Sequence, residues 1–304
     1  MREVSADTVE SGRPPLLLLH GWVGSGGLNW LRAFDVLSQH YRVLAPDFRG
    51  HAHGEACRTK FSIEDCADDM GALLEVLSPD EPAIVVGYSM GGMVAQELWR
   101  RHRSRVGGLV LSATSCAPVP VSRSRDSFTR AMSSARSTLR RVSRGLNAPL
   151  RFSSRMDENV ARAFGKAFES KLFRSSATLQ GLNSKGAPGA SGTTKADSDS
   201  GQTDALRTWV REEFARHHWP TILDAGRAIA EFDTRSWIRG VDVPTTVMLT
   251  KRDRLVSPAQ QQDMADRIPG ARIESVDAGH FACVREDFGP RILRSARRIE
   301  HAMA

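Results

Sequence analysis

The sequence predicts an α/β fold: a mostly parallel, doubly wound sheet of about seven strands with an inserted, mainly helical cap. Short apolar runs alternate with amphipathic, helix-compatible segments up to about residue 114, and the alternation resumes from about residue 244. Within one of these units, residues 83–93 (AIVVGYSMGGM), a strand-like run leads through a glycine-flanked serine straight into a helical segment. The 304 residues, 40% of them hydrophobic, suffice for one such domain with an insertion.

The first part of the chain alternates strand and helix. The expected strands are short apolar runs, typical of strands buried on both faces, at residues 15–20, 41–46, 82–88 and 106–113. The expected helices carry apolar residues at helical spacing, at residues 29–39, 62–78 and 90–104. Ser62, three residues before Asp65, can cap the second helix. Because helices separate these strands, neighbouring strands should be parallel.

The last part of the chain returns to the same pattern. A strand-like run within residues 242–258 ends at Asp253, and a helix should begin near Ser257. A shorter strand ends before His280, and a terminal helix is expected from about residue 285. The predicted core domain therefore comprises residues 1–114 and 241–304.

Residues 115–240 interrupt the alternation and should form a cap over the carboxyl ends of the strands. Within this insertion, residues 121–155 contain nine arginines and one acid, a local charge of about +8 against +7 for the whole chain. Residues 181–203 contain almost nothing apolar and should be mobile. Residues 204–234 look helical, with one or two apolar faces.

The arginine-rich stretch admits more than one interpretation. It can be a solvated helical face or a mobile lid, or it can attract anionic lipid surfaces or acidic acyl substrates. Nucleic acid is not expected, because the stretch has Phe128 and Phe152 at its flanks but no interleaved aromatic platform.

The serine at position 89 stands at the apex of the strand–turn–helix unit. Such a turn forces a strained backbone, and glycines at 87 and 91 remove the side-chain collisions that it would cause. The hydroxyl then projects from the sheet, with the positive end of a helix behind it. This is the arrangement that nucleophilic acyl transfer requires.

A second loop should lie close to this serine. The apolar run within residues 14–27 stops at His20-Gly21-Trp22, and the glycines that follow allow a tight approach. We assign the backbone N–H groups of Trp22 and Met90 as donors to a developing oxyanion. His20 closes a buried strand and is expected to order the loop through hydrogen bonds rather than to transfer protons.

Two further strand ends supply an acid and a base. Asp253 follows the strand within residues 242–258, and His280 follows the next strand through a glycine that lets its loop fold back. The strand at 106–114 ends without a carboxylate, which leaves Asp253 as the acid. The other histidines are assigned to helix ends (His40, His102) or to solvated loops and tails (His51, His53, His217, His218, His301).

These segments, in the chain order Ser–Asp–His, resemble the α/β-hydrolase superfamily, and in particular small bacterial serine esterases and lipases. The matching motifs are H-G-W at 20–22, D-x-R-G-H at 47–51, G-Y-S-M-G-G at 87–92, Asp253, and G-H at 279–280. The resemblance covers roughly residues 14–114 and 205–295. In two departures, Ala52 replaces a glycine that usually continues the second motif, and the short segment before His20 has room for one strand rather than a hairpin.

The resemblance implies hydrolysis of a carboxylic ester with an apolar acyl group, with Ser89 as nucleophile, His280 as base and Asp253 as its partner. Trp30 and Tyr88 are assigned to substrate binding, and no metal or organic cofactor is expected. The same triad also suits a lactonase, thioesterase, C–C hydrolase or cofactor-free perhydrolase (haloperoxidase). A non-catalytic hydrolase-fold binding protein is the alternative from another class.

Composition adds expectations about location. The sequence has neither a signal-peptide pattern at its N-terminus nor an apolar run long enough to span a bilayer. Four cysteines (Cys57, Cys66, Cys116, Cys283) lack metal-binding spacing and are expected to be reduced thiols. We therefore expect a cytoplasmic protein that acts on a small-molecule ester and that is peripheral to a membrane if the arginine-rich stretch binds anionic lipids. Its oligomeric state stays open.

Overall fold

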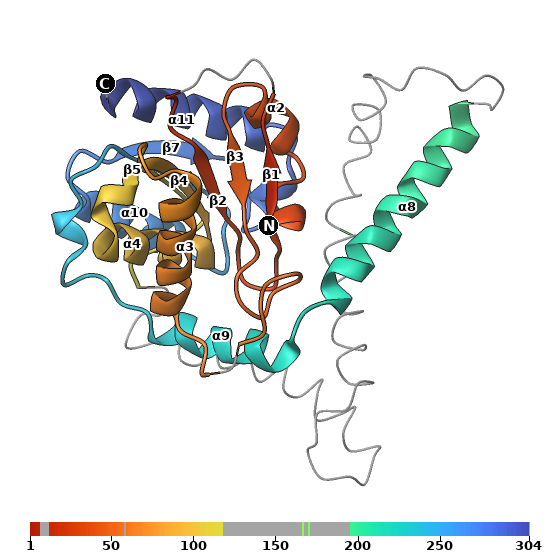
Figure 1. The fold of residues 1–304 in the computed structure, drawn as a ribbon, viewed down its shortest axis with the longest axis horizontal. Helices are drawn as coiled ribbons and strands as arrows, with labels where there is room; N and C mark the ends of the chain where they lie inside the picture. The colour runs from red at the N-terminus through yellow and green to blue at the C-terminus, as the bar shows by residue number, and fades with distance from the viewer. Residues whose placement is uncertain (7–11, 58, 118–165, 167–169, 171–194, 304) are drawn as a thin grey trace, which may run out of the picture.

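The computed structural model describes residues 1–6, 12–57, 59–117, 166, 170 and 195–303 (Figure 1). The arginine-rich stretch at 121–155 and residues 181–194 therefore lie outside the described residues. Side chains are described from residue 204 onward in the helix that begins at Lys195.

A seven-stranded sheet forms the centre of the molecule, as the sequence predicts. Its strand order is β1-β3-β2-β4-β5-β6-β7, and only β1 is antiparallel to its neighbour. The strands are β1 (Arg2–Val4), β2 (Leu16–Leu19), β3 (Val43–Ala45), β4 (Ala83–Tyr88), β5 (Val106–Ser112), β6 (Thr245–Thr250) and β7 (Arg272–Val276). The segment before His20 thus holds one antiparallel strand and one central strand.

Helices cover both faces of the sheet, and β2 shows how each face is built. Leu17 and Leu19 point into one core cluster, while Leu16 and Leu18 point into the other, because side chains alternate along a strand. The first cluster includes residues of α3 (Ile63–Leu77), α4 (Met90–Arg101) and α10 (Pro258–Arg267). The second includes residues of α1 (Gly26–Trp30), α2 (Phe34–Ser38) and α11 (Phe288–Met303).

The helix boundaries follow the expected caps. Ser62 accepts a hydrogen bond from the Asp65 N–H at 3.0 Å and begins α3, and Ser257 begins α10 with a capping box to Gln260. The expected helix at 90–104 ends as α4 at Arg101, and Arg103–Arg105 form the short 3₁₀ helix η1.

The single helix expected at 29–39 is instead two short helices, α1 and α2. The turn between them packs closely against α11. A Cβ added at Gly289 would lie 2.8 Å from the Arg32 carbonyl oxygen and 2.9 Å from the Ala33 Cα atom. The turn therefore fits against a helix from the far end of the chain, which local periodicity does not reveal.

Two helices of the predicted cap, α8 (Lys195–Ala215) and α9 (Trp219–Glu231), are described. Residues 195–203, the end of the stretch expected to be mobile, belong to α8. In Figure 1, α9 lies across one end of the sheet and α8 extends away from the sheet. Phe214 and Trp219 pack with Leu28 and Val23 of the core. The assignment of residues 115–240 as one cap domain stays a prediction.

Within the described part of the chain, no helix has the length and apolar character needed to cross a bilayer.

Candidate active site

Ser89 occupies the sharp turn between β4 and α4. Its backbone has φ 54° and ψ −118°, a conformation that residues other than glycine rarely adopt. A Cβ at Gly87 would lie 2.5 Å from the Gly91 carbonyl oxygen, so position 87 must be glycine for the turn to close. A Cβ at Gly91 would lie 2.1 Å from the Leu19 carbonyl oxygen, so this glycine lets α4 pack against the end of β2.

The structure brings the three predicted side chains together. The Ser89 Oγ atom lies 3.0 Å from His280 Nε2, and His280 Nδ1 lies 2.8 Å from Asp253 Oδ2. Ser89 follows the carboxyl end of β4, Asp253 follows that of β6, and His280 follows that of β7. Because these strands are parallel, the three loops meet at one edge of the sheet.

Asp253 is buried, and both of its carboxylate oxygens accept hydrogen bonds. Its Oδ1 atom accepts the N–H groups of Leu255 (2.8 Å) and Val256 (3.0 Å), and its Oδ2 atom also accepts the Thr250 hydroxyl at 2.9 Å. Burial by itself would raise the pKa of this carboxyl. The hydrogen bond and charge of His280 and the two backbone N–H groups outweigh that effect and hold the pKa below its usual range. Asp253 is therefore ionised at neutral pH.

The ionised carboxylate determines which nitrogen of His280 carries the proton. A carboxylate oxygen only accepts hydrogen bonds, so in the neutral ring Nδ1 donates to Asp253 and Nε2 accepts. The Ser89 hydroxyl can then donate to Nε2 across 3.0 Å. This arrangement can transfer the serine proton to the imidazole as the oxygen attacks an electrophile.

The loop after β2 lies against the serine. A Cβ at Gly21 would be 3.3 Å from Ser89 Cβ, and the Gly21 N–H donates to Asn29 Oδ1 at 3.0 Å. The Trp22 indole N–H donates to the Ile222 carbonyl of α9 at 2.7 Å. Met90 is the first residue of α4, where a helical N–H has no intrahelical acceptor. The two proposed oxyanion donors thus belong to the loop after β2 and to the first residue of α4.

The assignment of Trp30 to substrate binding is not supported by its position. Trp30 has no exposed surface and stacks on Phe288, with ring centroids 5.9 Å apart. Tyr88 is 4% exposed, and its ring lies 6.4 Å from Trp30 and 5.8 Å from His280. Burial raises the pKa of Tyr88 well above its usual value. Both rings belong to the core beneath His280, because α11 supplies apolar partners that are distant in sequence.

His20 orders loops, as predicted. It is fully buried, accepts the Phe48 N–H at Nε2 (3.0 Å) and contacts the Gly21 carbonyl through Nδ1 (2.9 Å). The expectation that His51 and His217 are solvated is wrong: they are 0% and 5% exposed. The His51 ring lies 5.1 Å from that of His20 and 5.8 Å from that of His217. His53, His218 and His301 are exposed.

His217 lies between α8 and α9 and is buried because its ring is hydrogen-bonded to two loops of the core, those at Val23 and Ala52. Its Nδ1 atom accepts the Ala52 N–H at 2.8 Å, and its Nε2 atom contacts the Val23 carbonyl at 3.3 Å. Ala52 has φ 41°, in the region that favours glycine, so the residue that replaces the usual glycine is held in a strained conformation. The hydrogen bond from its N–H helps to maintain that conformation.

The buried histidines predict a loss of stability in mild acid. Burial lowers the pKa of His217 from 6.5 to about 4, despite the opposing charge of Asp47, and lowers those of His20 and His51. Below pH 6.5 the unfolded chain therefore binds protons that the folded chain does not. The free energy of unfolding should fall between pH 6.5 and pH 4, by about 3 kcal/mol for His217 alone.

Urea denaturation at several pH values measures this effect. His217→Asn keeps a side-chain acceptor near Ala52 but cannot titrate, so its stability should fall less between pH 7 and pH 5 than that of the wild type. His301→Asn changes an exposed histidine and is the control. An equal pH slope for wild type and His217→Asn would contradict the prediction.

Sequence reasoning missed the polar residues that support the site. Gln261 of α10 is fully buried and donates to Thr250 Oγ1 at 2.8 Å and to the Val256 carbonyl at 2.8 Å, so it supports the loop that carries Asp253. Asn29 is 5% exposed and holds the Gly21 N–H. Gln261 and Asn29 are polar residues at helical positions that face inward, and this pattern in the sequence could have identified them as supporting residues.

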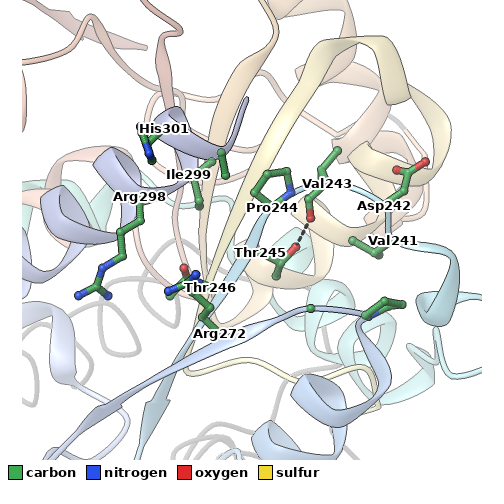
Figure 2. A pocket seen from close by; sticks show the side chains of 13 residues that line it. Val241, Asp242, Val243, Pro244, Thr245, Thr246, Arg272, Arg298, Ile299 and His301 are labelled. Atoms are coloured by element: carbon green, nitrogen blue, oxygen red, sulfur yellow. Dashed lines mark hydrogen bonds between the residues drawn. The ribbon is translucent and has the colours of Figure 1, made fainter. Parts of the chain in front are cut away.

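A cavity of about 690 Å³ lies away from these residues (Figure 2). Its lining comes from the amino ends of β6 and β7 and from α11, and includes Thr246, Arg272 and Arg298. Ser89 follows the carboxyl end of β4, which is parallel in the sheet to β6 and β7. The cavity is therefore at the opposite edge of the sheet and is not part of the site around Ser89.

The described residues contain neither a disulfide bond nor a cluster of side chains suited to a metal ion. All four cysteines are free thiols. Burial raises the pKa of Cys66, that of Cys116 to about 11 and that of Cys283 to about 12. The described part of the chain contains no group of three or more His, Cys, Asp or Glu side chains arranged to hold a metal ion.

Comparisons with known proteins find relatives that are esterases and structures that share the fold. A pimeloyl-[acyl-carrier protein] methyl ester esterase of Chromobacterium violaceum is 28% identical over 279 residues, 90% of this chain and 91% of the relative. The esterase of the same name from Aromatoleum aromaticum is 44% identical over 103 residues, 34% of this chain and 38% of the relative. The solved enol-lactonase from Burkholderia xenovorans LB400 shares the fold, with a TM-score of 0.64 at 21% identity over 100% of this chain and 95% of that one.

The family model for the alpha/beta hydrolase fold matches residues 14–287, which include Ser89, Asp253 and His280. The mostly parallel seven-stranded sheet is the architecture of the hydrolase structures that resemble it. The chain therefore belongs to the α/β-hydrolase family.

Proposed function

We propose that the protein hydrolyses a carboxylic ester with an apolar acyl group through a covalent acyl-enzyme. The observation that carries the proposal is the continuous hydrogen-bonded series from Ser89 Oγ through His280 to Asp253, with distances of 3.0 and 2.8 Å. The similarity to methyl ester esterases supports an ester as the substrate.

In the proposed mechanism, His280 takes the Ser89 proton as the hydroxyl oxygen attacks the ester carbonyl carbon. The N–H groups of Trp22 and Met90 stabilise the resulting oxyanion, each contributing roughly 3 kcal/mol. His280 then protonates the departing alcohol and leaves the acyl group on Ser89. A water molecule repeats the sequence and releases the carboxylic acid.

The surroundings of Ser89 support an apolar acyl group. Val23 and Leu28 of the core pack with Phe214, Trp219 and Ile222 of the predicted cap, and Trp22 packs against the same cluster. Leu255, whose N–H bonds Asp253, and Phe281, which follows His280, are 61% and 37% exposed. We propose that the acyl chain lies along the partly exposed Trp22 or along the exposed Leu255 and Phe281.

The same triad also suits lactones, thioesters, C–C bonds and peroxide chemistry, and the shared fold with an enol-lactonase does not choose among them. A non-catalytic binding protein remains the alternative from another class. Association with anionic lipids through residues 121–155 concerns a segment outside the described residues, and it stays a prediction, as does a cytoplasmic location.

Two measurements on the wild-type protein test the proposal. A fluorophosphonate probe should label the protein at one residue, Ser89, identified by mass spectrometry of the labelled peptide. The protein should also hydrolyse a chromogenic acyl ester faster than a matched lactone or thioester. The absence of labelling would favour a binding protein, whereas labelling with faster lactone or thioester turnover would replace the ester assignment.

A further inference from the structure

The loop that approaches Ser89 is strained. Val23, a β-branched residue, has φ 60°, a conformation that such residues rarely adopt. The Gly24 N–H donates to the Gly21 carbonyl at 3.0 Å and closes a tight turn around this residue. A conformation of this kind persists only where its surroundings hold it. The hydrogen bonds of residues 21–25, hereafter the oxyanion loop, therefore show which parts of the protein hold this strained conformation.

On the core side, α1 holds both ends of the oxyanion loop. Asn29 accepts the Gly21 N–H at 3.0 Å, from a side chain that is 5% exposed. Ser25 caps α1, because its Oγ atom accepts the Leu28 N–H at 3.1 Å. The Gly21 N–H is thus committed to Asn29, which fixes the orientation of the His20–Gly21 peptide, one peptide before the one that carries the Trp22 N–H.

On the other side, α8 and α9 hold the same loop at three points. Ser25 Oγ donates to Glu213 of α8 at 2.6 Å, and the carboxylate of Glu213 is also paired with Arg2 at 3.0 Å. His217, between the two helices, contacts the Val23 carbonyl at 3.3 Å. The Trp22 indole donates to the Ile222 carbonyl of α9 at 2.7 Å. Figure 1 shows α9 lying across the end of the sheet where β2 and β4 terminate.

We propose that α8 and α9 dock on the oxyanion loop and hold it in its strained conformation, with Asn29, Ser25 and Glu213 as positioning residues. Gly21 has so little space beside Ser89 that a small shift of the loop moves its N–H groups relative to the serine oxygen. Docking of these two helices is then a condition for oxyanion stabilisation. This inference rests on the proposed function and adds a role for the helices beyond covering the substrate.

The first test removes the tether on the core side. Asn29→Leu keeps a side chain of similar size but accepts no hydrogen bond from Gly21. We expect kcat for a chromogenic ester to fall about 10- to 100-fold, with KM within about 3-fold of the wild-type value. A purely structural role would lower the melting temperature and leave kcat per folded, fluorophosphonate-reactive protein unchanged, and that outcome would overturn the proposal.

A pair of matched cap variants gives a second test, which does not depend on the folding of Asn29→Leu. Ser25 and Ser62 both cap helices through their hydroxyl oxygens, but only Ser25 belongs to the oxyanion loop and bonds to α8. Both Ser25→Ala and Ser62→Ala lose a helix cap and should lower the melting temperature, Ser25→Ala more because it also loses the hydrogen bond to Glu213. Only Ser25→Ala should lower kcat, by about 10-fold or more. Equal kcat values for the two variants would count against the proposal.

The third test addresses α8. Glu213→Gln keeps an oxygen that can accept the Ser25 hydroxyl, whereas Glu213→Leu does not. The Gln variant should keep kcat within about 3-fold, and the Leu variant should lose about 10-fold or more with little change in KM. If both retain wild-type kcat, docking of α8 does not position the loop. If the wild type itself neither reacts with fluorophosphonate nor hydrolyses esters, the proposed function has failed instead.

Discussion

Replacing Ser89 by alanine is expected to lower kcat for a short-chain chromogenic ester by about 10⁵- to 10⁶-fold. The serine oxygen is the atom that forms the acyl-enzyme in the proposed mechanism, and its proton is the one that His280 receives across 3.0 Å. Alanine fits the same backbone without adding atoms, so the turn, His280 and Asp253 should remain in place. The loss should therefore appear in kcat, while the melting temperature changes little.

A matched serine on the neighbouring strand provides the control. Ser112 ends β5, is fully buried, and its hydroxyl has no hydrogen-bond partner among the described residues. Ser112→Ala makes the same chemical change at a neighbouring strand end, without a hydrogen-bonded partner to lose, and should change kcat by no more than about 3-fold. Ester hydrolysis by Ser89→Ala within about 100-fold of the wild-type rate would mean that another group performs the chemistry.

The parts of the site that the sequence predicts well share a physical cause. A buried run followed by a turn fixes a strand end, and parallel strands bring their carboxyl ends to one edge. Ser89, Asp253 and His280 could therefore be expected to converge although they lie far apart in the chain. The two elbow glycines follow from the same local geometry, because their hydrogen atoms face backbone at distances that exclude a Cβ.

The errors concern residues whose environment comes from distant segments. Trp30 was assigned to substrate binding, but Phe288 of α11 stacks on its ring and Trp30 has no exposed surface. His217 lies in a polar sequence and is buried by contacts with Val23 and Ala52, more than 160 residues earlier. Composition around a residue does not contain this information. Asn29 was missed for a different reason: its partner Gly21 is only eight residues earlier, but the sequence does not show which group an inward-facing amide bonds.

Replacing Asp253 by asparagine is expected to lower kcat by about 10⁴-fold, with much smaller effects on KM. The reason is the direction of the hydrogen bonds around this side chain. Its Oδ1 atom accepts two backbone N–H groups, from Leu255 and Val256, so the carbonyl oxygen of an asparagine would take that position. The amide NH₂ would then face His280 Nδ1, where Oδ2 now lies at 2.8 Å.

An NH₂ group at that position can only donate, so His280 Nδ1 would become an acceptor and its proton would move to Nε2. Nε2 would then present a hydrogen to Ser89 and could not take the serine proton. Asp277→Asn is the matched control, because it makes the same change on an exposed loop residue three positions before His280. It should leave kcat within about 3-fold. If Asp253→Asn keeps kcat within 10-fold, His280 does not need this carboxylate to hold its reactive tautomer, and the proposed series of hydrogen bonds ends at the histidine.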